Sequence, residues 1–168
     1  VSHTTDLAVD FGRKVRNLIA LDAYRSIFPT VKLAQDSKSA GRWNTNVGGE
    51  YYACGIGSAL AGRGADLLLV DDPHSEQDVI NGNFGVFEKA YEWFTFGART
   101  RLMPHGAVAI IQTRWHLDDL TGRVVRDMGK NERADQYDVV EFPAILDVLD
   151  KKTEKTVQKP LWPEFFDL

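Results

Sequence analysis

The chain has 168 residues, of which 43% are hydrophobic and 26% are charged, and its formal net charge is -4. This composition suits one globular domain with a sizeable core, and the acidic balance argues against a strongly basic protein that coats nucleic acid. The single cysteine, Cys54, excludes an intrachain disulfide and a Cys-rich zinc site, so a reducing cytoplasm is expected. No apolar run approaches the roughly 20 residues that span a bilayer, so no membrane partner is expected.

Helical periodicity and turn residues predict the elements of the first half of the chain. Thr4 or Thr5 can cap the first helix, after which apolar residues recur every three or four positions. Pro29 is not tolerated inside a helix, so the second helix must end before it. The predicted elements are a helix over 5–20, a short helix over 23–28, and a β-hairpin of 42–46 and 51–55 around Gly48 and Gly49.

Apolar runs and amphipathic patterns alternate in the second half of the chain. The run from Leu67 to Val70 is fully apolar, which is typical of a central parallel strand covered on both faces. Aromatic residues between 84 and 101 recur at helical spacing and predict a long helix with a core-facing stripe. The other predicted elements are a strand over 107–111, a helix capped by Asp118, a strand over 139–142, a loop or short hairpin over 151–159, and an apolar tail over 161–166. The alternation of strands and helices predicts an α/β fold with a largely parallel sheet.

Two adjacent carboxylates, Asp71 and Asp72, come directly after the first apolar run and before Pro73. The carboxyl ends of strands are where open α/β sheets place ligand-binding groups. In a P-loop NTPase, the first such carboxylate holds Mg²⁺ and the second orients and deprotonates the attacking water. The alternative for these residues is a polar strand exit in which Asp-Pro begins a turn.

Two further segments contain residues that suit phosphate chemistry. The second apolar strand ends in Gln112 and Thr113, either of which could sense a γ-phosphate through a hydrogen bond. The alternative there is a plain strand exit with Arg114 exposed and Trp115 packed. Two glycines flank Arg63, so the backbone is free to present this arginine to the charge of a phosphoryl group. For Arg63 the alternative is a solvent-exposed loop arginine.

Taken together, these segments resemble the large subunit of the DNA-packaging terminases of tailed bacteriophages. Four segments follow the family's order, and the resemblance spans nearly the whole chain. They are Ser2–Ala8 with Asp10–Asn17, similar to the helix after the strand that follows the P-loop unit; Gly41–Asp66, similar to the hairpin and glycine-rich loop; Leu67–Pro73, similar to the Walker B strand; and Gln112–Arg123, similar to the coupling motif and its helix. The closing Leu161–Glu164 resembles the exit from the ATPase domain.

The resemblance implies a P-loop NTPase-like fold of the RecA/ASCE type, with a mostly parallel sheet flanked by helices, and ATP and Mg²⁺ as cofactors. Residues 1–160 would be a partial ATPase domain, incomplete at the N-terminus, and 161–168 the start of a linker toward a nuclease domain. The full-length protein would form a homo-oligomeric ring in the bacterial host cytoplasm. With ATP hydrolysis it would package double-stranded viral DNA into the procapsid, together with the portal protein and the small terminase subunit.

The resemblance also assigns roles to single residues. It makes Asp71 the magnesium-site carboxylate, Asp72 the catalytic base, Arg63 an arginine that reaches a neighbouring subunit's nucleotide, and Gln112, Thr113 and Arg114 the link between the γ-phosphate and domain motion. The family often has Glu where this chain has Asp72, so Glu76 is a possible substitute for the base.

One departure from the family pattern changes the expected activity. No Gly-x-x-x-x-Gly-Lys-Ser/Thr segment, the loop that cradles the phosphates, occurs in the chain. The 168 residues alone are therefore expected not to hydrolyse ATP at a useful rate, although the full-length protein would be an ATPase. Two alternatives remain, namely another P-loop nucleic-acid translocase such as a helicase, and a non-catalytic prophage remnant or interaction module that binds portal, small terminase or DNA.

Overall fold

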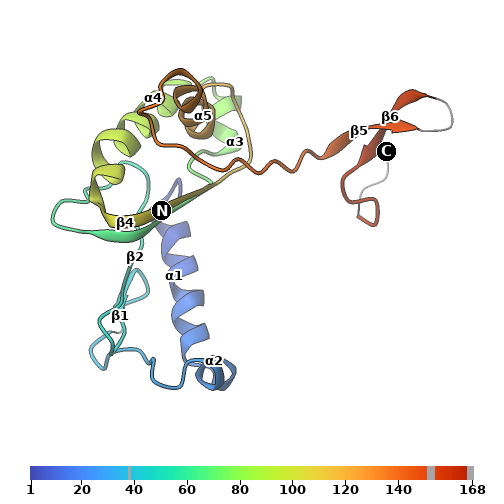
Figure 1. The fold of residues 1–168 in the computed structure, drawn as a ribbon. Coiled ribbons are helices and arrows are strands. Elements are labelled where there is room, and N and C mark those ends of the chain that lie inside the picture. Colours follow the sequence, from blue (N-terminus) through green and yellow to red (C-terminus); the bar gives the residue numbers. More distant parts are fainter. Residues whose placement is uncertain (38, 151–153, 166–168) are drawn as a thin grey trace. The chain divides into compact units, whose positions relative to one another are not determined.

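The computed structural model describes residues 1–37, 39–150 and 154–165 (Figure 1). These residues form two compact units, Val1–Asn131 and Glu132–Leu168. Over these described ranges the fold is mixed α/β with three small two-stranded sheets, of which one is parallel. A mixed α/β class is thus confirmed, whereas the P-loop topology and the division at residue 160 stay predictions.

Helix α1 and a short hairpin form one part of the first unit. α1 spans Thr5–Ile19, and the Thr4 side chain caps it by accepting a hydrogen bond from the backbone of Leu7. The hairpin consists of β1 and β2, which pair antiparallel. Both elements are confirmed, as is α2 ending before Pro29. The bounds are Asp22–Ile27 for α2, Arg42–Asn44 for β1 and Glu50–Tyr52 for β2.

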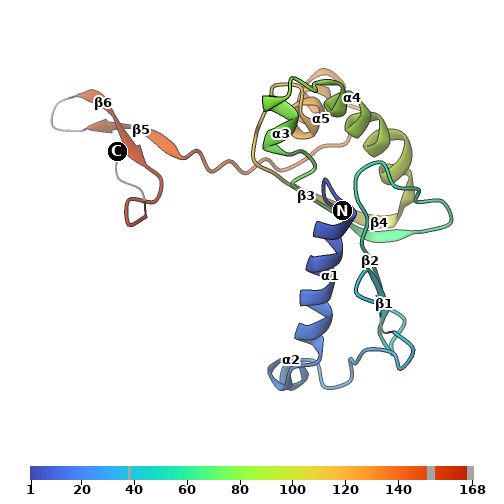
Figure 2. The same ribbon diagram turned by 180° about the vertical axis from the view of Figure 1, so that it is seen from behind.

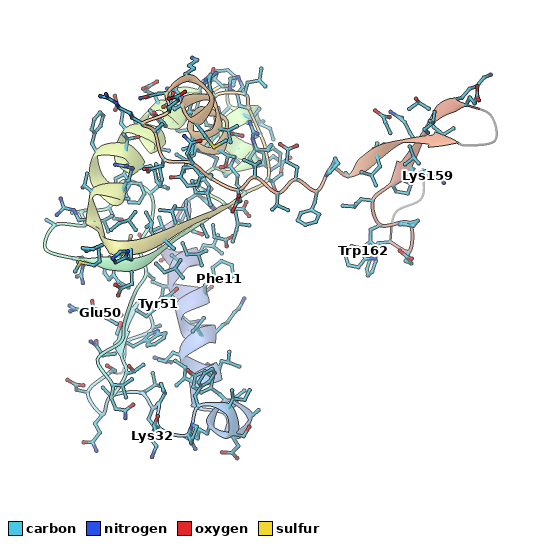
Figure 3. The ribbon with its side chains drawn as sticks, viewed as in Figure 1. Phe11, Lys32, Glu50, Tyr51, Lys159 and Trp162 are labelled. Atoms are coloured by element: carbon cyan, nitrogen blue, oxygen red, sulfur yellow. The ribbon has the colours of Figure 1, made fainter. Side chains whose placement is uncertain are left out.

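The hairpin packs on α1 through aromatic side chains. Trp43 is only 6% exposed, and its indole N–H donates to the Gly12 carbonyl at 3.2 Å. Its ring stacks on that of Tyr51 with the centroids 4.8 Å apart. Figure 3 shows Tyr51 on the side of the hairpin that faces α1, whereas Phe11 points away from the hairpin. α1 approaches the hairpin closely at Gly12, where an added Cβ would lie 2.7 Å from the Tyr51 ring.

The parallel pair of β3 and β4 is the centre of the first unit. β3 spans Ala65–Asp71 and β4 spans Leu102–Ile111, with Leu68 opposite Val108 and Asp71 opposite Ile111. The start of the chain lies along the other edge of β3. The Val1 amino group donates to the Leu69 carbonyl at 2.7 Å, and the Asp71 N–H donates to the Val1 carbonyl at 2.8 Å.

One face of the β3–β4 pair is covered and the other is not. Leu68 and Val70 are buried at 7% and 0% exposure. The helices α3, α4 and α5 gather over one face of the pair (Figures 1 and 2). Leu67 and Leu69 point the opposite way and are 61% and 44% exposed. The expectation of a strand covered on both faces is therefore wrong for this chain. The reason is that α1 extends alongside the hairpin and does not lie across the sheet.

The helices over the covered face follow the amphipathic pattern. The predicted helix over 84–101 is a helical run in three parts, and its stripe residues Phe87 and Phe94 are buried. The helix after β4 is capped by Asp119 and not by Asp118, because the Asp119 side chain accepts from the backbone N–H three residues on. The bounds are Glu76–Ile80 for α3, Gly85–Glu92 for α4, Trp93–Ala98 for a π-helical turn, Arg99–Arg101 for a 3₁₀ turn and Leu120–Lys130 for α5.

The second unit is a single hairpin. β5 spans Ile145–Asp150 and pairs antiparallel with β6, Lys155–Pro160. The predicted strand over 139–142 is wrong, because this segment forms no strand with any of the residues described. Of the alternatives for 151–159, the hairpin is confirmed from residue 155 onward. The part of that expectation on 151–153, and the tail expectation on residue 166, lie outside the described residues.

The contact between α1 and the hairpin can be tested by Gly12→Ala. An added methyl would lie 2.5 Å from the Ala40 carbonyl oxygen and 2.7 Å from the Tyr51 ring, and the backbone oxygen is unable to move aside cheaply. We expect the free energy of unfolding to fall by about 1–3 kcal/mol in denaturant titrations. Gly129→Ala is the matched helical control, because it meets no atom within 4 Å and should stabilise α5 by up to about 1 kcal/mol. Equal effects of the two substitutions would contradict the packing.

Candidate functional site

The carboxyl ends of β3 and β4 bring two of the predicted polar segments together. The Thr113 N–H donates to Asp72 Oδ1 at 3.1 Å, and the Asp72 N–H donates to the Ile111 carbonyl at 2.9 Å. Parallel strands end at the same edge of a sheet, so residues that follow each strand meet there. The structure therefore places Asp71, Asp72 and Thr113 at one strand-end site, as the sequence pattern suggested.

The backbone at this site is held on both sides of the carboxylates. Asp72 has φ of 42°, a left-handed conformation that is uncommon outside glycine. The His3 N–H donates to the Asp72 carbonyl at 3.1 Å, and the Ser2 hydroxyl donates to the Asp71 carbonyl at 2.6 Å. Ser2 is itself only 1% exposed. These contacts fix the main chain and leave the two half-buried carboxylates to bind other groups.

Gln112 supplies a second polar group at the end of β4. Both atoms of its side-chain amide are buried and have no hydrogen-bond partner within the described part of the chain. A buried amide normally has a partner, because leaving it unpaired costs free energy. Gln112 thus brings an unsatisfied donor and acceptor to the same region as Thr113.

Arg114 does not join this group. Its Nε donates to the carboxylate of Asp119, at 3.0 Å from Oδ1 and 2.9 Å from Oδ2. Asp119 is completely buried. The guanidinium is therefore engaged by a buried counter-charge at the start of α5, and it is not directed to the carboxylates after β3 by any contact in the described residues.

Arg63 and Glu76 also lie apart from the carboxylates. The Arg63 guanidinium pairs with Glu50 at 3.1 Å and stacks on the Tyr52 ring, 3.8 Å from its centroid. Arg63 is thus held on the β1–β2 hairpin within its own chain. Glu76 is the exposed first residue of α3, and the described contacts do not connect it to Asp72.

His74 is a residue whose importance the sequence did not reveal. Its ring is 4% exposed, lies edge-on to Phe87, and accepts the Leu120 N–H on Nε2 at 3.0 Å. Burial lowers the pKa of His74, and the nearby carboxylates Asp119 and Asp78 oppose that effect. The neutral ring is the form that can accept this hydrogen bond, so burial and geometry favour the same protonation state.

The sequence contained a partial signal for Asp119 and none for His74. Asp119 is followed three residues later by Gly122, whose N–H it accepts at 2.8 Å, which is the spacing of a helix N-cap. The adjacent Asp118 has almost the same spacing, and the sequence pattern does not distinguish them. His74 is remote from Leu120 in the chain, so only the tertiary fold shows their contact.

The residues at the strand ends fit a magnesium ion better than they fit a nucleotide. Mg²⁺ prefers carboxylate and water oxygens as ligands. Asp71 and Asp72 supply the carboxylate oxygens. No cluster of three or more His, Cys, Asp or Glu side chains that could hold a metal occurs among the residues described. Other oxygens, such as those of phosphate, would have to complete the coordination shell. Arg114 is engaged elsewhere, and the described residues provide no cradle for phosphates.

Comparisons with protein-family models, with curated proteins and with solved structures found no match to this chain. Within the described ranges, no helix has the length and apolar character that crossing a membrane requires.

The hydrogen bond to His74 predicts a pH dependence of stability. Its folded-state pKa is depressed, so the contribution of the neutral ring is fully present above the usual value of 6.5 and is lost as pH falls below it. We expect the free energy of unfolding to decline by up to about 1.4 kcal/mol per pH unit in that window.

The measurement is denaturant unfolding between pH 7.5 and 5 of the wild-type chain and of His74→Gln. Glutamine can accept the same N–H but does not titrate, so the variant should lose this part of the pH dependence. His3→Gln, at an exposed position, is the control and should keep it. An identical pH profile for wild type and His74→Gln would show that His74 is not responsible.

Proposed function

We propose that this chain is part of the ATP-hydrolysing motor of a bacteriophage terminase large subunit, the machine that packages double-stranded DNA into a procapsid. The observation that carries the proposal is the hydrogen bond from Thr113 to Asp72 across the parallel β3–β4 pair. In a P-loop NTPase, the magnesium-site carboxylate and the residue that senses the γ-phosphate occupy the ends of neighbouring parallel strands. The order of the segments along the chain agrees with this arrangement.

In the proposed mechanism the two carboxylates have different roles. Asp71, the last residue of β3, would hold Mg²⁺, which neutralises charge on the phosphates when it is bound. Asp72 would accept a proton from the attacking water on Oδ2, because its Oδ1 already accepts from Thr113. Glu76 is exposed at the start of α3 and remains the alternative base.

The free edge and open face of the sheet support the proposed nucleotide unit. Within the described residues β4 pairs with β3 alone, so its other edge has no strand partner. Leu67 and Leu69 on β3, with Ile111 on β4, expose an apolar surface on one face of the pair. A phosphate-binding strand beside β4, followed by a helix over this face, would satisfy the unpaired backbone and bury the apolar side chains.

The residues predicted to bind or sense phosphate start from different contacts in this proposal. The amide of Gln112 is unsatisfied and buried, so it would have to become accessible before it could bond a phosphate oxygen. Arg63 would have to leave Glu50 to reach a nucleotide on a neighbouring subunit of the ring. Arg114 would act through Asp119 and helix α5 and would not touch phosphate. DNA, the portal and the small terminase subunit would bind the assembled motor.

A non-catalytic interaction module is the second candidate. It is favoured by the engagement of Arg63 and Arg114 with Glu50 and Asp119, which leaves the strand-end site without a free arginine from either motif. Nucleotide binding separates the two candidates, because the motor requires it and the module does not.

The proposal predicts a Gly-x-x-x-x-Gly-Lys-Ser/Thr segment in the reading frame ahead of Val1. With that segment included, the protein should hydrolyse ATP, and Asp72→Asn should lower the rate by about 10²–10⁴-fold while nucleotide binding persists, since only the base is lost. Asp66→Asn, an exposed carboxylate in the first half of the same strand, is the control and should retain activity. Steady-state phosphate release and equilibrium nucleotide binding are the measurements.

One set of outcomes would contradict the motor, and another would contradict the proposed placement of the phosphates. A frame without the segment, and a protein that binds no Mg-ATP, would favour the interaction module. Robust Asp72-dependent hydrolysis by residues 1–168 alone would mean that the phosphates bind elsewhere than proposed.

A further inference from the structure

The Asp119 side chain, near the strand-end site, accepts an unusually large number of hydrogen bonds. Its carboxylate is completely buried and accepts hydrogen bonds from four separate residues. The donors are the side chain of Arg114 and the backbone N–H groups of Trp115, His116 and Gly122, at distances between 2.8 and 3.4 Å. A plain helix cap satisfies one or two backbone donors at the start of a helix. Here the carboxylate also binds the loop that enters the helix.

The loop between β4 and α5 is closed by these contacts. Besides binding Asp119, the Arg114 guanidinium donates to the His116 carbonyl at 3.4 Å. A side chain at Gly122 would collide with the Leu117 carbonyl and lie 2.7 Å from Arg114, so α5 approaches the loop closely. The residues after Thr113 are therefore fixed to the first turn of α5.

Thr113 itself has no such support. It is exposed, and its described hydrogen bond is the one from its N–H to Asp72. Its position therefore depends on β4 before it and on the Asp119-bound loop after it. The exit of β3 is fixed to the same helix end, because His74 accepts the Leu120 N–H. The segment that leaves β3 and the segment that leaves β4 are thus both held by contacts at the start of α5.

We infer that Asp119 is a positioning residue of the strand-end site: by binding the loop after β4, it holds the Thr113 N–H on the Asp72 carboxylate. Asp119 touches neither Asp72 nor any reacting group, and it acts through Arg114 and the backbone of Trp115 and His116. As a statement about catalysis this inference rests on the proposed function, in which Asp72 is the base. As a statement about geometry it applies to the chain as it stands.

The experiment follows the Thr113 amide resonance by NMR in the 168-residue chain. Asp72→Gly removes the acceptor and suits the left-handed backbone, so it should shift this resonance in the wild-type background. In an Asp119→Asn background the same substitution should lose most of that shift, because the amide is no longer held on residue 72. Asp118→Asn is the matched control. The Asp118 carboxylate is 44% exposed and pairs with Arg126, so the full shift should remain.

The outcomes separate positioning from capping. If Asp119 only caps α5, Asp119→Asn will weaken amide protection in α5 while the response of Thr113 to Asp72→Gly stays complete, and the inference is overturned. If Asp119→Asn does not fold, Asp119→Ser replaces it, because one serine hydroxyl can cap α5 but cannot bind Arg114 and the loop amides together. A complete Thr113 response in that variant overturns the inference equally. Loss of the response in a protein whose longer form binds no nucleotide would keep the positioning role and remove the proposed reaction.

Discussion

The parallel pairing of β3 and β4 is the constraint on which the rest of the first unit depends. A parallel pair needs a long crossover, and here the segment from α3 to the 3₁₀ turn provides it and covers one face of the pair. With antiparallel strands, Asp72 and Thr113 would follow opposite ends of the sheet. In the parallel arrangement both follow the same end, and one backbone N–H joins them. The chemistry proposed for the site is therefore a consequence of strand direction.

Around that site, some of the described polar groups have hydrogen-bond or ion-pair partners and others do not. Arg114 and Asp119 neutralise each other, one of them fully buried, and His74 is kept uncharged where it accepts a hydrogen bond. These groups form a rigid support, because breaking a buried pair leaves an uncompensated charge. Among the described residues at the strand ends, the amide of Gln112 and the carboxylate of Asp71 have no such partner. They are also the ones that the proposed nucleotide and metal would use.

Local patterns predicted α1, α2, the helical run that begins with α4, α5 and the two parallel strands, because periodicity is read from neighbouring residues. They did not predict the short helix α3. The predictions that were wrong concern strand pairing and tertiary contacts, which neighbouring residues do not show. The apolar segment 139–142 lacks a strand partner, whereas Ile145–Asp150 forms a strand because the residues after it fold back in register. Asp118 and Asp119 both precede α5, and only the tertiary position of the carboxylate shows which one caps it. His74 was missed for the same reason, since nothing near it in sequence indicates that it is buried.

The left-handed backbone at Asp72 bears on the identity of that residue. Residues with a short polar side chain enter this region more readily than longer ones, because the side chain bonds locally to the main chain. Glutamate, with its longer side chain, enters this region less readily than aspartate does. Of the two acidic residues, aspartate is thus the one that this backbone favours. The shape of the chain is a reason for aspartate here that is independent of any need for a base.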